Sequence, residues 1–256
     1  MDLYCKMKKM KSRVLILISV TIFYFTMTAA AFSQKMPEVD RIHTSAGDVE
    51  MFFIGHGSLM FRHEGFVIHI DPVSSSGNYE GLPAADLVLV THEHYDHLDT
   101  DLIKKLRKKE TVLICNPASA PELPGSRIMK AGDKVIVSNI TIEAVPAYNI
   151  VHERAKGQPF HPKGSGNGYV ISIADKRFYV AGDTENIPEM KNLSNIDVAF
   201  LPMNLPYTMT PEMVADAAKT FKPAILYPYH YGETNTGEIK RLLKDTGIEV
   251  RIMELK

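Results

Sequence analysis

The sequence is poor in cysteine, with Cys5 and Cys115 as its only two. It also lacks an excess of charge of either sign, because 29 Lys and Arg residues stand against 30 Asp and Glu residues. The formal net charge of −1 therefore predicts no nucleic-acid partner. Hydrophobic residues make up 45% and charged residues 23%, which excludes a collagenous, low-complexity or disordered chain. A chain of 256 residues suits one domain with a large buried core.

The first 33 residues differ from the rest of the chain. Five basic residues between positions 6 and 13 precede an almost unbroken apolar segment over residues 14–25, and small residues follow. This order is typical of a secretory signal peptide, with Ala31 and Ser33 as the small side chains at the cleavage site. We predict cleavage after Ser33, or alternatively after Ala31, and export to the periplasm or the extracellular space. The other interpretation is an uncleaved anchor, although a membrane span needs about 20 apolar residues.

Removal of residues 1–33 would leave residues 34–256 as the mature domain, with 24 basic and 29 acidic residues and a formal net charge of −5. Such a protein is a poor candidate for binding RNA or an anionic membrane. Contact with a membrane is expected only through an uncleaved signal. Because only Cys115 would remain, the mature chain cannot form an intrachain disulfide.

Short β-like runs dominate from residue 49 onward, in two blocks that each lead into helices. The first block has predicted strands at 49–54, 66–70, 86–90 and 111–115, with a helix after the third. The second block has predicted strands at 134–137, 141–145, 168–173, 177–180, 198–201, 224–227 and 249–253. One helix is predicted to begin at Thr210 and Pro211, and another to end at Gly247. Strands that follow one another without crossover helices favour an α+β fold of two packed sheets over a doubly wound sheet.

Two segments show no clear periodicity. Residues 34–45 are predicted to be a polar lead-in to the first strand. Residues 149–168 are polar and rich in glycine, and they exceed the length of an ordinary connection. This segment is therefore either a functional loop or a disordered one.

Four side chains that commonly bind metals fall within six residues: His92, His94, Asp96 and His97. They follow the continuously apolar run 87–90 and precede a predicted helix, so the backbone turns where these side chains meet. Imidazole and carboxylate are ligands for zinc or a similar divalent ion. A single ion could not easily use all four from so tight a turn, which favours two ions. The alternative, a polar solvated loop, requires these residues to cluster by chance.

The segment 92–97 resembles the His-x-His-x-Asp-His signature of the metallo-β-lactamase superfamily. Other motifs resemble the branch that includes L-ascorbate-6-phosphate lactonase and N-acyl phosphatidylethanolamine phospholipase D: Gly55-His56-Gly57-Ser58, Ile70-Asp71-Pro72, Ala181-Gly182-Asp183-Thr184 and Tyr227-Pro228-Tyr229-His230. The resemblance covers most of the mature chain. It implies a four-layer αββα sandwich with a dinuclear metal site at one edge.

Two of these motifs supply ligands from distant parts of the chain. Asp183 is the aspartate of the only Ala-Gly-Asp motif that follows a strong predicted strand. At the outgoing end of that strand its carboxylate could bridge two cations about 3.5–4 Å apart. His230 ends the predicted strand 224–227 in the same way, and we interpret it as a ligand rather than a capping or surface histidine.

One expected ligand is missing. Related enzymes carry a histidine in the loop after the strand that matches 141–145, but this sequence reads Pro146-Ala147-Tyr148-Asn149 there. We predict that His161 replaces it, because this residue runs directly into the next strand. A substrate contact at His161 and a coordination position filled by water are the alternatives. His152 lies among charged residues and is expected to be solvated.

The remaining candidates have supporting roles. Flanking glycines let His56 approach the site, where it either orients the substrate or a metal-bound water or only forms a hairpin turn. Asp71 is expected to form a hydrogen bond with a ligand histidine. Three histidines show no ligand spacing and are interpreted as surface or strand residues: His43, His63 and His69. Three tyrosines line a substrate pocket or belong to the core: Tyr207, Tyr229 and Tyr231.

The resemblance implies hydrolysis at a two-metal site. One ion would be held by His92, His94 and His161, the other by Asp96, His97 and His230, with Asp183 as the bridge. Zinc is the expected metal, with manganese or iron as alternatives. A bridging hydroxide formed at about pH 7 would attack an ester, lactone or phosphodiester. Asp96 or Asp183 would then relay the proton to the leaving group.

The expected partner is a small-molecule or lipid-like substrate. A catalytically inactive sensor or scaffold that only binds metal is the alternative, which the missing histidine near Asn149 favours. An oxidoreductase of the same fold would use iron and a flavin partner domain, and the 256 residues contain no such domain.

Overall fold

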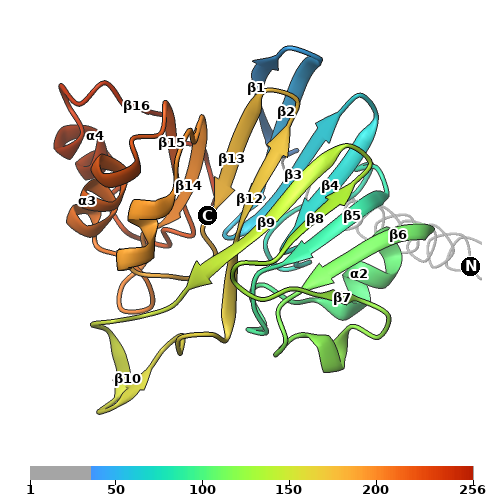
Figure 1. The fold of residues 1–256 in the computed structure, drawn as a ribbon, viewed down its shortest axis with the longest axis horizontal. Coiled ribbons are helices and arrows are strands. Elements are labelled where there is room, and N and C mark those ends of the chain that lie inside the picture. The colour runs from blue at the N-terminus through green and yellow to red at the C-terminus, as the bar shows by residue number, and fades with distance from the viewer. Residues whose placement is uncertain (1–35, 256) are drawn as a thin grey trace, which may run out of the picture. The chain divides into compact units, whose positions relative to one another are not determined.

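The computed structural model describes residues 36–255 (Figure 1). The core consists of two seven-stranded sheets, and β10 (Glu153–Ala155) and β11 (Gln158–Pro159) form a separate hairpin. The predicted signal peptide, residues 1–33, lies outside the described residues. Among residues 36–255, no helix is long and apolar enough to cross a membrane.

The first sheet contains its strands in chain order: β1 (Glu38–Thr44), β2 (Gly47–Gly55), β3 (Ser58–His63), β4 (Phe66–Ile70), β5 (Ala85–Val90), β6 (Arg107–Cys115) and β7 (Arg127–Ile128). The prediction of a polar lead-in was wrong, because β1 pairs antiparallel with β2 along its full length. Only Ile42 and Thr44 of this edge strand are buried, so its sequence carries little apolar signal. β3 was also not predicted.

The second sheet has the order β16-β15-β14-β13-β12-β9-β8. Its strands are β8 (Lys134–Val137), β9 (Ile140–Ala147), β12 (Gly166–Ile173), β13 (Lys176–Val180), β14 (Val198–Pro202), β15 (Ile225–Tyr229) and β16 (Glu249–Val250). The predicted strand at 249–253 was too long. Beyond Val250 the chain continues without regular strand pairing, and the Leu255 carbonyl accepts a hydrogen bond from the His56 N–H (2.8 Å).

Helices cover the outer faces of the two sheets. α2 (Thr100–Leu106) buries Leu102, Ile103 and Leu106. The other two α-helices are α3 (Pro211–Phe221) and α4 (Gly237–Leu242). Two short 3-10 helices also occur, η1 (Ala120–Glu122) and η2 (Pro188–Asn192). The predicted N-cap is confirmed, since the Thr210 side chain accepts a hydrogen bond from the Met213 N–H. Figure 1 shows α3 and α4 on one side of the sheets and α2 on the other, which is the predicted four-layer αββα arrangement.

The inner faces of the sheets meet through aromatic side chains. Phe61 of β3 lies 5.5 Å from Phe178 of β13, measured between ring centroids. Phe53 of β2 lies 5.0 Å from Tyr227 of β15. These rings are almost completely buried and pack against further apolar residues from both sheets. The close-packed interface fixes the relative positions of the strand ends, where the candidate site lies.

His69 of β4 predicts a pH dependence of stability. It is fully buried, its Nε2–H donates to the Pro83 carbonyl (3.0 Å), and its Nδ1 has no hydrogen-bond partner. Burial lowers the pKa of His69, so the unfolded chain takes up a proton on this residue before the folded chain does. Its contribution to stability is therefore complete above the unfolded pKa and is lost progressively as the pH falls from there toward the lowered pKa of the folded state.

The test is urea unfolding at about pH 7.5 and about pH 5.5. His69→Gln should lose less unfolding free energy between these pH values than the wild type does. His43→Gln, at an exposed position, serves as the control and should match the wild type. An unchanged pH dependence in His69→Gln would contradict this role of burial.

Candidate metal centre

The structure gathers all seven predicted ligand side chains at one edge of the sandwich: His92, His94, Asp96, His97, His161, Asp183 and His230. The first four follow β5, and Asp183 and His230 follow β13 and β15. His161 lies between β11 (Gln158–Pro159) and β12. Each side chain therefore stands at or near a strand end, and strand pairing brings these ends together.

Three imidazoles form the first potential ligand group. The Nδ1 atom of His94 lies 3.1 Å from Nε2 of His92 and 3.2 Å from Nε2 of His161. A tetrahedral zinc ion with Zn–N distances of 2.0–2.1 Å would hold its nitrogen ligands about 3.3 Å apart. The spacing of the three nitrogens thus fits one shared cation. His161 thus takes the ligand position predicted for it, in place of the histidine that is missing from residues 146–149.

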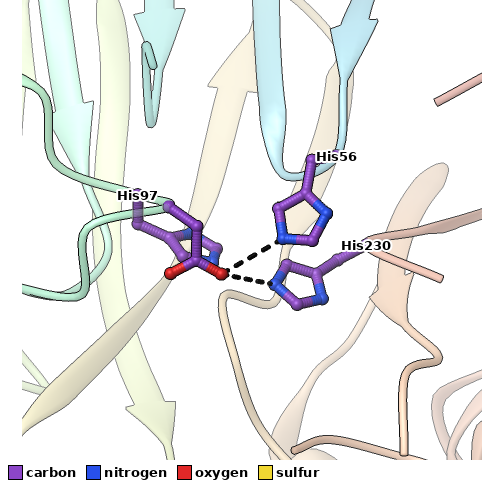
Figure 2. Close-up of side chains that lie close together, drawn as sticks. His56, His97 and His230 are labelled. Carbon is purple, nitrogen blue, oxygen red and sulfur yellow. Dashed lines mark hydrogen bonds and ion pairs between the residues drawn. The ribbon is translucent and has the colours of Figure 1, made fainter. Parts of the chain in front are cut away.

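A second group contains Asp96, His97, His230 and also His56. Oδ2 of Asp96 lies 3.2 Å from Nε2 of His56 and 3.6 Å from Nε2 of His230. Figure 2 shows the rings of His56 and His230 next to each other, with a centroid separation of 3.8 Å, and His97 beside them. His56 therefore belongs to the site, although it also forms the turn between β2 and β3 with a φ of 49°.

Asp183 lies between the two groups. Its Oδ2 is 3.3 Å from Nε2 of His161 in the first group and 3.4 Å from Nε2 of His230 in the second. Its Oδ1 is 3.3 Å from Nε2 of His97. Despite these short distances, four buried atoms of these residues have no hydrogen-bond partner: His97 Nε2, Asp183 Oδ1 and both ring nitrogens of His230. Because unsatisfied buried polar atoms are costly, these donor atoms fit bound cations better than an internal hydrogen-bond network.

The electrostatics of the site couple the buried carboxylate of Asp183 to the surrounding imidazoles. Burial, reinforced by the nearby His97, holds the pKa of His92 well below its ordinary value. Burial would also lower the pKa of His97, but Asp183 and Asp71 outweigh it and raise that pKa well above normal. Burial would raise the pKa of Asp183, yet His230 and His97 hold it well below normal. The site thus contains a buried carboxylate, Asp183, that requires nearby positive charge. It also contains a neutral imidazole, His92, and the neutral ring is the form of histidine that binds metals.

The predicted hydrogen bond from Asp71 is confirmed. Its Oδ2 accepts from Nδ1–H of His97 (2.7 Å), which leaves Nε2 of His97 free to face the centre. Asp71 is itself held by the backbone N–H (2.7 Å) and the hydroxyl (2.6 Å) of Thr91. Gly57 has a steric role, because a Cβ there would lie 2.8 Å from Cε1 of His97. Both features fix the His97 ring in place.

Two residues that support His161 were missed. Nδ1–H of His161 donates to Oδ1 of Asn149 (2.7 Å), and Nδ2 of Asn149 donates to Oε1 of Glu185 (3.0 Å). Asn149 belongs to the segment in which a histidine was expected, and it orients the ring of His161. Asn149 could have been suspected from its position, whereas Glu185 carries only the weak signal of following Asp183 in the same loop.

Glu185 is fully buried and organises the loop that contains Asn149. Its carboxylate accepts hydrogen bonds from the backbone N–H groups of Ile150, Val151 and His152 (2.7–2.8 Å). It also accepts one from the His152 ring (2.6 Å), so the prediction that His152 is solvated was wrong.

The three tyrosines separate into two classes. Tyr229 and Tyr231 are buried in the core, which decides between the two interpretations for these residues. Tyr207 is exposed, and its backbone carbonyl accepts a hydrogen bond from Nδ2 of Asn149 (2.9 Å).

Fold and site together define a protein with a metal centre at one edge of an αββα sandwich. The sequence profile of the β-lactamase superfamily domain matches residues 50–230. A UPF0173 metal-dependent hydrolase from Methanopyrus kandleri is 29% identical over 222 residues, which cover 80% of this chain and 95% of the relative. A UPF0173 metal-dependent hydrolase from Enterococcus faecalis is 29% identical over 194 residues, which cover 72% and 86%.

Solved structures give the same result. A crystal structure named as that of a metal-dependent hydrolase from Parabacteroides distasonis is 48% identical, covers 86% of this chain and 100% of its own, and has a TM-score of 0.82. Igni18, a metallo hydrolase from Ignicoccus hospitalis, shares the fold with a TM-score of 0.68 at 24% identity, covering 81% and 95%. The chain belongs to the metallo-β-lactamase superfamily. It is a metal-dependent hydrolase of this fold.

The contact between Asn149 and His161 predicts a selective loss of metal affinity. Asn149→Ala removes the acceptor that orients the His161 ring, and loss of such a partner typically weakens metal binding about 10- to 100-fold. Titration with zinc against a chromophoric chelator should show this loss at one of two binding steps. Asn192→Ala, at an exposed position, should bind zinc as the wild type does. Equal weakening of both steps, or none, would contradict the positioning role.

Proposed function

We propose that the protein is an exported hydrolase that cleaves an ester, lactone or phosphodiester with two divalent cations. His92, His94 and His161 would hold one cation, and Asp96, His97 and His230 the other. The observation that carries this proposal is the position of Asp183, whose carboxylate faces both ligand groups at 3.3–3.4 Å. Zinc suits the imidazole-rich first group, and the carboxylates of the second group also suit manganese or iron.

When bound, two such cations lower the pKa of a shared water to about 7 and polarise the oxygen of the bond under attack. The residues of the chain then divide the remaining tasks. Asp183 is buried and enclosed by imidazoles, so its role is to hold the centre together. Asp96 and His56 are partly exposed, at 27% and 28% of their side-chain surface, and lie on the side that solvent reaches. We therefore assign proton relay to Asp96 and substrate orientation to His56.

The motifs that resemble the lactonase and phospholipase D branch favour these bond types over a β-lactam. The alternative of an inactive sensor or scaffold rested on the missing histidine near Asn149. Because His161 lies in the first ligand group, the described residues offer no specific support for that alternative.

His94→Ala tests the dinuclear mechanism. Loss of the nitrogen that lies between His92 and His161 should reduce bound zinc from about two ions per chain to about one. Hydrolysis of bis(p-nitrophenyl) phosphate, p-nitrophenyl esters or lactones should fall by at least about 10³-fold in kcat/KM, since a two-metal site needs both ions. Elemental analysis and these assays on the purified protein provide the readouts, with His43→Ala as the control. Full turnover with one ion per chain would rule out the two-metal mechanism.

Export has its own test. The full chain, produced in a Gram-negative host with its own N-terminus, should appear in the periplasmic fraction. N-terminal sequencing of that material should start at Gln34, or at Phe32 if cleavage follows Ala31. A protein that retains Met1, or that remains in the membrane fraction, would contradict cleavage of the signal.

A further inference from the structure

Exposed apolar side chains are concentrated beside the metal centre. Residues 36–255 contain nine large exposed hydrophobic side chains. Five of them lie on loops that carry predicted ligands, contact them, or contact Asn149, which binds His161. We call these five the apolar rim: Tyr95, Ile150, Val151, Leu205 and Tyr207. Soluble proteins commonly place exposed apolar groups together where a ligand covers them.

Sequence neighbours and hydrogen bonds connect the apolar rim to the centre. Tyr95 stands between His94 and Asp96 in the sequence. Ile150 and Val151 follow Asn149, and the buried carboxylate of Glu185 binds both of their backbone N–H groups. The position of these two residues is therefore fixed relative to Asn149, which binds the ring of His161.

The second loop of the rim is attached to the first. The carbonyl of Tyr207 accepts a hydrogen bond from Nδ2 of Asn149 (2.9 Å). The ring of Tyr207 packs edge to face on Phe160, with 5.1 Å between centroids, and Phe160 immediately precedes His161. The apolar surface thus begins one residue from a predicted metal ligand and extends over two loops that are held in fixed positions.

We infer that the apolar rim binds a hydrocarbon chain or ring attached to the bond that is hydrolysed. This inference rests on the proposed hydrolase function and narrows it to esters or phosphodiesters with an apolar substituent. The substituent would cover side chains that otherwise remain in water, while the polar head lies among the imidazoles and carboxylates. The rim would cover each methylene of the substituent only in part. Each methylene should therefore improve binding about twofold, which corresponds to roughly half the free energy gained when a methylene is fully buried.

Two ligand series test the inference on the metal-loaded protein. The first is a series of n-alkyl phosphonates with about four to about twelve carbons, measured by calorimetry, because a phosphonate binds metal ions without being hydrolysed. The second is the matching series of p-nitrophenyl esters, measured as kcat/KM. In the wild type, Kd should fall and kcat/KM should rise with chain length. The double variant Val151→Ser, Tyr207→Ser should flatten both trends, so that Kd and kcat/KM depend little on chain length.

Ile136→Ser is the matched control. Ile136 and Val151 have the same exposed fraction, 68%, but Ile136 lies in β8 and outside the apolar rim. This variant should keep the dependence on chain length. The double variant can be confirmed as folded by its zinc content and its unfolding midpoint.

The outcomes separate this inference from the proposed function. Turnover that is independent of chain length in the wild type, with phosphonate affinity equally independent, would overturn the inference and leave the hydrolase proposal intact. Absence of both phosphonate binding and ester or phosphodiester turnover at every length would overturn both. Binding that depends on chain length, without ester or phosphodiester turnover, would support the rim and contradict hydrolysis. Two further outcomes, each without an effect of chain length, would overturn the inference. Vesicles of phosphatidylglycerol that bind the wild type but not the double variant would assign the surface to a membrane. A dimer that the double variant dissociates would assign it to a second copy of the chain.

Discussion

The Asp183 carboxylate is buried among imidazoles that cannot all satisfy it by hydrogen bonding. Its two oxygens lie 3.3–3.4 Å from nitrogens of His97, His161 and His230, yet Oδ1 and two of these nitrogens have no hydrogen-bond partner. A buried arrangement of this kind is costly unless positive charge balances it. Bound cations would supply both that charge and the missing bonds. The other features of the site follow from this requirement.

The scaffold meets this requirement by fixing the directions of the rings. Asp71 binds Nδ1 of His97, and Asn149 binds Nδ1 of His161, so that both rings turn Nε2 toward the centre. These two supports come from opposite sheets, since Asp71 follows β4 and Asn149 follows β9. The aromatic packing between the sheets therefore contributes to the geometry of the metal centre as well as to stability.

Much of this arrangement could be predicted from the sequence, because its main parts leave local signals. The ligands at 92–97, Asp183 and His230 each follow an apolar strand, and strand ends that share an edge bring their side chains together. His161 could be predicted from its position just before a strand. Asp71 was expected to bind a ligand histidine because it ends a predicted strand on the same side of the fold. The structure identifies that partner as His97.

The parts that were missed depend on contacts between distant segments or on weak patterns. Glu185 binds the loop that begins at Asn149, 36 residues earlier in the chain, and no periodicity reports such a pairing. His152 was expected in solvent because its sequence neighbours are charged, but the same buried carboxylate binds it. β1 is an edge strand whose outward side chains are polar, so it resembled a lead-in segment.

The central claim is that Asp183 is shared by two cations, and the most direct measurement is anomalous diffraction from a crystal of the protein grown with zinc. Two anomalous peaks per chain are expected, both in contact with the Asp183 carboxylate. One peak should also contact His92, His94 and His161, and the other Asp96, His97 and His230. A single peak that Asp183 does not contact, or peaks only outside this cluster, would contradict the claim.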